Sequence, residues 1–194
     1  MNAVNKTLPH ILRRCAHVAI IAIPIIYYYF LVPVVSTKIL HVSILIVIFF
    51  VFLFEKFRLR MKLVFYGQRQ NEALRISAFS WTVFSLGIIL FFSPVIDYVL
   101  PIVATCALVD PLLGEMRLHH MNKMVTVCVG LVAAWIIWFA CAHYYHFPFY
   151  IAALLAPISV AVEWPNFRWV DDNALMLLVP FLIVSGAYMD SSVL

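Results

Sequence analysis

Acidic and amide side chains gather in a short segment near the carboxyl end of the chain. Glu163 is followed by Asp171, Asp172 and Asn173, directly before an apolar stretch. Helix capping needs one residue, so a cap by Asp172 or Asn173 leaves a second carboxylate and Glu163 unexplained. Carboxylates packed together repel one another unless a cation or a metal-bound phosphate offsets their charge. The segment therefore predicts a site for such a ligand.

A second acidic segment lies where an apolar run in the middle of the chain ends. Asp110 directly follows that run, with Pro111, Glu115 and Arg117 after it. An ionisable group near membrane depth is costly and indicates function by default. The structural alternative is an interfacial acid that turns the chain with Pro111. Carboxylates hold Mg²⁺ and guanidinium groups bind phosphate oxygens. The candidate metal ligands are Asp110, Glu115, Asp171 and Asp172.

Basic side chains precede the first apolar stretch. Arg13 and His17 are four residues apart and share one face of a helix, with Arg14 beside them. These residues are candidates for binding phosphate. As topology determinants, however, the two arginines need no further role.

Two more charged pairs have the i, i+3 spacing of a helix. They are Glu55 with Arg58 and Arg69 with Glu72. Both pairs could be salt bridges on a solvated helix surface, which contribute little to stability.

The composition shows that the segments that carry these residues belong to a membrane protein. The chain has 194 residues, is 65% hydrophobic and contains 13 basic and 9 acidic residues. Soluble domains are about 45–50% apolar, so a water-soluble globule is excluded. With only 5 glycines and no P-loop pattern, the chain has no glycine-rich phosphate cradle. Any bound phosphate needs other donors.

Seven apolar stretches are candidate membrane-spanning helices. They cover residues 16–35, 39–54, 76–92, 95–109, 124–142, 147–162 and 174–189. The third and fourth are separated only by Ser93 and Pro94, so residues 76–109 could instead form one kinked span or a re-entrant hairpin. With seven spans and a cytoplasmic N-terminus, 12 basic residues lie inside and only Lys38 lies outside, whereas merging the two stretches gives nine against four. We therefore predict an all-α, multi-pass transmembrane helical bundle of about seven spans, forming a single domain over residues 1–194.

The same topology places acids beside the basic residues. Seven of the nine acidic residues fall on the cytoplasmic side. Acids interleaved with Arg and Lys at the ends of several helices suit a metal-bound polyphosphate. The alternative is that loops are simply where charges occur.

The order of these motifs resembles the polyprenol kinase family. The motifs are Arg-Arg-x-x-His before the first stretch, Glu55 at the end of the second, Arg69-x-x-Glu72 before the third, Asp110-Pro-Leu-Leu-x-Glu after the fourth, and Glu163 with Asp171-Asp172-Asn173 before the last. The family includes dolichol kinase, phytol kinase and CTP-dependent diacylglycerol kinase. These are membrane enzymes that phosphorylate a lipid alcohol with a nucleoside triphosphate, usually CTP.

The resemblance implies a Mg²⁺-dependent lipid-alcohol kinase that acts at the cytoplasmic face of a bacterial inner membrane or an endoplasmic reticulum membrane. Its partners would be CTP or another nucleoside triphosphate, a lipid alcohol and membrane lipids, with no nucleic acid. The expected catalytic residues are Asp110, Asp171 and Asp172. The expected nucleotide- and substrate-binding residues are Arg13, Arg14, His17, Arg69, Glu72, Arg117, Lys123, Glu163 and Asn173.

Three alternatives stay open at this point. A lipid cytidylyltransferase would also use CTP and Mg²⁺ at a membrane face, but would release pyrophosphate rather than CDP. A small transporter is suggested by the seven spans and by Asp97, although no internal repeat is found. The third alternative is a structural or regulatory protein with a decayed kinase site.

Overall fold

The helical segment at the amino end is broken rather than continuous. The computed structural model describes residues 4–63, 74–93, 96–164, 167 and 170–191. In the described chain, α1 (Val4–Ala19) is followed by the short α2 (Ala22–Ile25) and the wider π-helix η1 (Ile26–Leu31). The apolar stretch Ile11–Leu31 runs through all three. The first predicted span is therefore interrupted at residues 20–21, where the chain makes a turn.

Six longer helices follow this segment in the described chain. They are α3 (Thr37–Arg60), α4 (Ala78–Phe92), α5 (Ile96–Leu118), α6 (Lys123–Tyr145), α7 (Phe149–Ala161) and α8 (Asp172–Ser191). Side-chain caps start α4 and α6, because the hydroxyl of Ser77 accepts from the Ser80 amide and the Asn122 side chain accepts from the Met124 amide. His146 ends α6 in the left-handed conformation.

The all-α prediction is confirmed over the described residues, which form helices and no strands. Four helical stretches are long and apolar enough to cross a membrane: Ile11–Leu31, Thr37–Arg60, Ile96–Leu118 and Lys123–Tyr145. The other apolar helices, Ala78–Phe92, Phe149–Ala161 and Asp172–Gly186, are shorter. The chain is therefore a helical membrane protein by length and composition.

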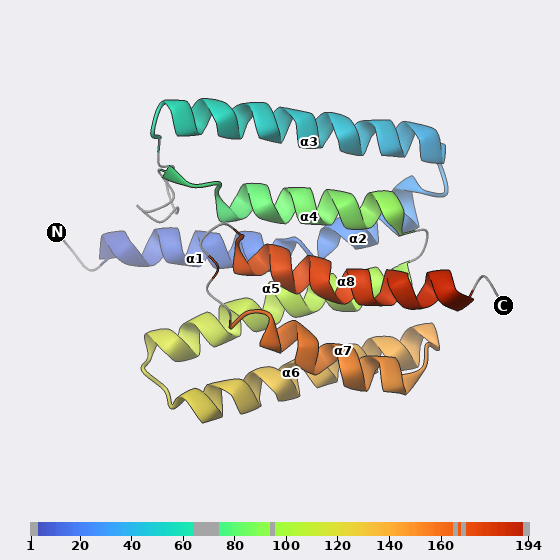
Figure 1. Cartoon of the computed structure of the whole chain (residues 1–194). Helices are drawn as coiled ribbons and strands as arrows, with labels where there is room; N and C mark the ends of the chain where they lie inside the picture. The colour runs from blue at the N-terminus through green and yellow to red at the C-terminus, as the bar shows by residue number, and fades with distance from the viewer. Residues whose placement is uncertain (1–3, 64–73, 94–95, 165–166, 168–169, 192–194) are drawn as a thin grey trace.

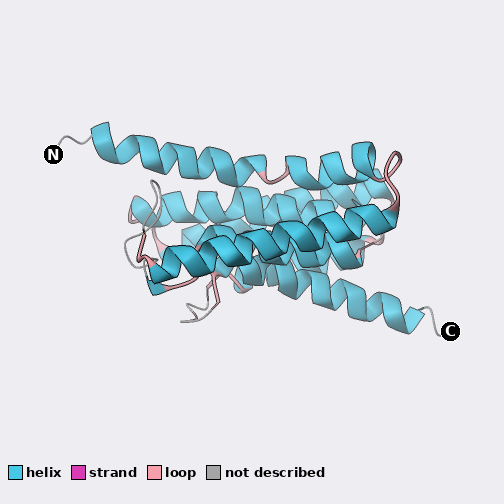
Figure 2. Cartoon of the chain, turned by 90° about the horizontal axis from the view of Figure 1, so that it is seen from above, coloured by secondary structure: helices cyan, strands magenta, loops and turns pink. Residues whose placement is uncertain are grey.

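Residues 76–109 form two helices rather than one kinked helix. α4 ends at Phe92, and α5 starts at Ile96 and runs back in the opposite direction (Figure 1). From α3 onward, successive helices alternate in direction, so the ends of α3, α5 and α7 lie at the same end of the bundle as the starts of α4, α6 and α8 (Figure 1). Seen from above, the helix axes are roughly parallel, and α1 begins at the end opposite to that where α8 finishes (Figure 2).

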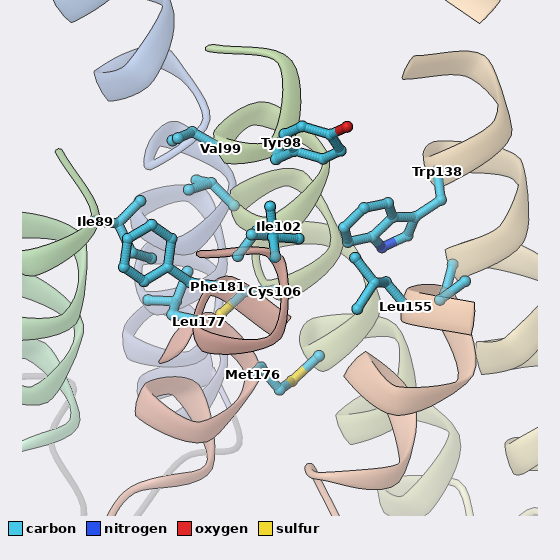
Figure 3. Packing of buried hydrophobic residues seen from close by; sticks show 14 of the residues in the cluster. Ile89, Tyr98, Val99, Ile102, Cys106, Trp138, Leu155, Met176, Leu177 and Phe181 are labelled. Carbon is cyan, nitrogen blue, oxygen red and sulfur yellow. The ribbon is translucent and has the colours of Figure 1, made fainter. Parts of the chain in front are cut away.

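α5 is the central helix of the bundle. It packs against α1, α2, α4, α6, α7 and α8. Its buried face includes Ile102 and Cys106, which lie close to Leu177 of α8, while Trp138 of α6 and Leu155 of α7 lie on the other side (Figure 3). α3, by contrast, packs on α4 and exposes most of its apolar side chains.

A small residue lets α6 approach this central helix. A Cβ atom added at Gly130 would lie 2.7 Å from Cδ2 of Leu113, which is fully buried in α5. Leu113 lies one helical turn beyond Asp110, so this close contact fixes the part of α5 that carries the acidic residues.

Candidate functional site

Three carboxylates from three separate segments converge at the charged end of the bundle. Asp110 lies in the second half of α5, Glu163 lies in the turn after α7, and Asp172 is the first residue of α8. One oxygen atom from each lies within 4.8 Å of the others. Glu163 is buried and the other two are partly buried. We call Asp110, Glu163 and Asp172 the carboxylate cluster.

The sequence of α5 explains how Asp110 reaches this position. Val109 and Leu113 are buried completely and fix the rotation of the helix, which leaves Asp110 at the edge of the packed face. Pro111 has no N–H group, so the carbonyl of Ala107 lacks its helical partner in this turn. The rotation of α5 around Asp110 is therefore fixed by packing, while one backbone hydrogen bond of the helix is missing beside it.

The start of α8 positions the aspartates that precede and begin it. The backbone N–H of Asn173 donates to Oδ1 of Asp171 at 3.2 Å and to Oδ1 of Asp172 at 3.1 Å. Carboxylates are favoured here because the first N–H groups of a helix carry partial positive charge. Capping therefore accounts for part of the acidic segment. It does not account for Glu163, which comes from another element.

Glu163 holds an unsatisfied oxygen atom inside the cluster. Its Oε1 accepts from Nη2 of Arg117, whereas its Oε2 is buried without a hydrogen-bond partner among the described residues. Burial raises the pKa of Glu163 to about 7; the negative charges of Asp110 and Asp172 act in the same direction, and the charge of Arg117 opposes them. A buried carboxylate oxygen without a partner is costly unless a donor or cation reaches it.

Asp171 lies beside the carboxylate cluster and also holds its proton tightly. Burial raises the pKa of Asp171 to about 7, and the adjacent charge of Asp172 adds to this effect. A bound divalent cation would stabilise the ionised forms of these acids. Carboxylate oxygens are ligands that Mg²⁺ favours. The donor set, with the unpartnered Oε2 of Glu163, therefore fits a divalent cation.

Basic side chains border the cluster from three helices. Arg14 of α1 pairs with Glu115, and Arg117 of α5 pairs with Glu163. Lys123, at the start of α6, lies with its Nζ 5.7 Å from the centroid of the Trp164 ring. Guanidinium and ammonium groups of this kind are the side chains that bind phosphate oxygens.

Two polar side chains lie on the inner side of the cluster. His17 is buried, and its Nε2 lies 3.2 Å from the carbonyl oxygen of Cys106 and 3.4 Å from Oδ2 of Asp110. Asn173 is also buried, and the thiol of Cys106 contacts its Oδ1 at 3.9 Å. The nucleotide-binding roles expected of His17 and Asn173 stay predictions.

The predicted site residues differ in where the structure places them. The structure brings Asp110, Asp172 and Glu163 together. Glu115 pairs with Arg14, and Asp171 accepts from the start of α8, so metal binding by either of them stays a prediction. Arg13 lies in α1 next to Arg14. Arg69 and Glu72 lie outside the described residues.

The interpretation of Glu55 and Arg58 as a surface pair is wrong. Both are buried, and the Arg58 side chain is 0% exposed. Arg58 donates to Glu55 Oε2 at 3.0 Å and Oε1 at 2.6 Å, and to the carbonyls of Leu63 and Arg75. The Glu55 carboxylate also accepts from the Ser77 amide at 2.6 Å and from the Ser80 hydroxyl at 2.9 Å.

A signal for this buried pair is present in the sequence. Glu55 and Arg58 continue a helix that is otherwise apolar, and Ser77 and Ser80 repeat the i, i+3 spacing at the start of the next helix. Two polar pairs that meet across a helical hairpin satisfy each other. The single-helix spacing rule cannot reveal this, because it ignores the partner helix.

A cavity at the opposite end of the bundle is separate from these residues. It has a volume of about 310 Å³ and lies between η1, α3 and the end of α4. His41 stacks on Phe91 there with ring centroids 4.3 Å apart, and the Tyr28 hydroxyl donates to the Ser93 carbonyl at 2.9 Å. The carboxylate cluster does not line this cavity.

Comparison with known proteins gives no relative. No family model, no curated protein and no solved structure matches the chain. The functional argument therefore depends on the cluster itself and on the motif order.

Chemically, the arrangement combines acids that suit a divalent cation with cations that suit an anion. Asp110, Glu163 and Asp172 provide the oxygens, and Arg14 and Arg117 provide guanidinium groups that already engage acids beside them. Such a site can bind a metal-bound phosphate group.

Proposed function

We propose that this chain is an integral membrane kinase that transfers the γ-phosphate of a nucleoside triphosphate, CTP in particular, to the hydroxyl of a lipid alcohol. The acceptor class is a polyprenol, phytol or diacylglycerol type of lipid. The observation that supports the proposal most is the convergence of Asp110 from α5, Glu163 from the turn after α7 and Asp172 from the start of α8. The motif order described above supplies the lipid-alcohol acceptor and the nucleotide.

Phosphoryl transfer requires mainly that the reacting groups are positioned in line and that the negative charge of the phosphates is neutralised. Asp110, Glu163 and Asp172 would hold Mg²⁺, which neutralises phosphate charge and orients the transferred group when bound. Arg117 and Arg14 would move from their carboxylate partners to phosphate oxygens, with Arg13 and Lys123 nearby.

Asp171 is our candidate for the proton acceptor. It directly precedes Asp172 without belonging to the carboxylate cluster, so its carboxylate lies beside the site and is not needed to hold the cation. The hydroxyl of the lipid would reach this carboxylate from the membrane side, with its tail between the apolar helices.

We propose further that the chain crosses the membrane seven times with a cytoplasmic N-terminus. The alternating direction of the helices supports this topology, because it gathers the charged segments at one end of the bundle (Figure 1). The positive-inside rule then assigns that end to the cytoplasm. The kinase reaction would take place there, and residues 1–194 would act as one domain.

The test is a transfer assay with the full-length protein in detergent. The protein is incubated with γ-labelled CTP or ATP, Mg²⁺ and a panel of lipid alcohols. We expect label in at least one lipid, release of CDP rather than pyrophosphate when CTP is the donor, and loss of label with EDTA. Release of pyrophosphate would instead support a cytidylyltransferase. No labelled lipid from a folded protein would contradict the proposal.

Asp172→Asn gives a sharper version of this test. The substitution keeps the size of the side chain and removes its charge, so we expect turnover to fall on the order of 100-fold. A regulatory protein with a decayed site would keep its biological effect in this variant.

A further inference from the structure

His17 contacts α5 at two acceptors rather than pointing to the outside of the site. Its Nε2 is 3.2 Å from the Cys106 carbonyl oxygen and 3.4 Å from Oδ2 of Asp110. The residue is only 9% exposed. A buried ring with its polar atom between two oxygens has little freedom to turn toward a ligand.

The chemistry of these acceptors fixes the proton on Nε2. A carbonyl oxygen can only accept, so the Nε2 atom that bonds to Cys106 must carry hydrogen. Nε2 also lies 3.4 Å from Oδ2 of Asp110, a close polar contact beside the hydrogen bond to Cys106. His17 therefore donates to the backbone of α5 and contacts a side chain four residues further along.

The contact from His17 is more buried than the other ion pair described between α1 and α5. Arg14, one turn before His17, pairs with Glu115, but both side chains are about one third exposed, at 28% and 32%, and such pairs contribute little. Cys106 also contacts Asn173 through its thiol. Thus α1, α5 and α8 meet around Cys106, which lies one turn before Asp110, and the α8 residue that it contacts, Asn173, directly follows Asp172.

We propose that His17 is a positioning residue that holds the Asp110 carboxylate in the orientation in which it meets Glu163 and Asp172. This inference rests on the divalent-cation site of the proposed function. It differs from direct phosphate binding, which is what the sequence suggests for His17. If His17 positions Asp110, its loss weakens metal binding in the absence of nucleotide. If His17 instead binds phosphate, its loss raises the KM for the nucleotide and leaves metal affinity unchanged.

The experiment measures Mn²⁺ binding by electron paramagnetic resonance on the full chain in detergent, with Mn²⁺ alone as the probe. His17→Phe keeps a ring of similar size and removes the donor. We expect it to raise the Kd for Mn²⁺ about 10- to 100-fold, the usual effect of losing a group that orients a metal ligand. His17→Gln retains an N–H donor at a similar reach, and should stay within about threefold of the wild type.

Two further variants complete the design. His17→Asn keeps an amide that is too short to reach both acceptors, so it should behave like His17→Phe. If the phenylalanine variant fails to fold in a thermal unfolding control, the comparison of Gln with Asn decides the matter. His143→Phe is the matched control, because His143 is exposed at the other end of α6. It should bind Mn²⁺ like the wild type.

The outcomes separate this inference from the proposed kinase activity. Equal Mn²⁺ affinity in the wild type and His17→Phe, no binding by the wild type, or no difference between Gln and Asn would each overturn the positioning role. Mn²⁺ binding that depends on His17, without labelled lipid in the transfer assay, would overturn the kinase and leave the positioning role standing. Labelled lipid together with a Mn²⁺ affinity that does not depend on His17 would support the kinase and overturn the positioning role.

Discussion

Replacing Arg58 with methionine leaves the Glu55 carboxylate buried without its cation, so we expect a large loss of stability. Arg58 is fully buried and donates to both Glu55 oxygens and to the carbonyls of Leu63 and Arg75. Removing one partner of a buried ion pair costs about 3–5 kcal/mol. For a chain of this length, that corresponds to a fall in Tm of roughly 6–20 °C.

The assay is thermal unfolding of the purified protein in one detergent, followed by circular dichroism. Arg60→Met is the matched control, because Arg60 is exposed in the last turn of the same helix and should change Tm little. The double variant Glu55→Met with Arg58→Met removes both charges. We expect it to be more stable than Arg58→Met alone, since no uncompensated charge then stays buried.

Two results would refute this reasoning. One is an Arg58→Met protein that unfolds at the same temperature as Arg60→Met. The other is a double variant less stable than Arg58→Met, which would show that the remaining hydrogen bonds to Glu55 matter more than the pairing of charges.

Two further predictions concern the acidic end of the bundle. Glu163 has an ordinary pKa of 4.5 that the fold raises to about 7, so its ionisation costs stability as the pH rises between these values. In EDTA, Glu163→Gln should therefore gain on the order of 3 kcal/mol relative to the wild type between pH 5 and pH 8; a difference in Tm that is independent of pH would contradict this. Gly130→Ala should cost about 1–3 kcal/mol because its Cβ would lie 2.7 Å from buried Leu113. Gly186→Ala, with open space around it, should cost nothing, and equal Tm values for the two variants would argue against close packing of α5 on α6.

The sequence predicts the helices well because a segment in lipid has to form its own backbone hydrogen bonds. Apolar runs in lipid must satisfy their own backbone, so each becomes a helix. The helix ends are less predictable. α3 continues to Arg60 and α5 to Leu118, beyond the apolar runs that end at residues 54 and 109, because charged side chains continue a helix once it has formed.

The site residues show which part of a site local spacing can reveal. Asp110 and Asp172 are detectable because each is an acid beside an apolar run. Grouping Asp110 with Glu115 ignores helix geometry, since positions five apart point about 140° away from each other. Glu115 instead faces Arg14.

Contacts between elements are what the sequence alone does not contain. The bond from His17 to Cys106 uses a backbone carbonyl, which no side-chain pattern reports. Likewise, the burial of Glu55 and Arg58 depends on the way α4 packs against α3.

We propose that the carboxylate cluster carries out the phosphorylation of a lipid alcohol. The most direct measurement compares Asp110→Asn with Asp97→Asn in the transfer assay. Both substitutions make the same chemical change in α5, Asp97 in its first turn and Asp110 in its second half. We predict that Asp110→Asn lowers labelled lipid on the order of 100-fold, while Asp97→Asn keeps wild-type turnover. Equal turnover in the two variants would contradict the account.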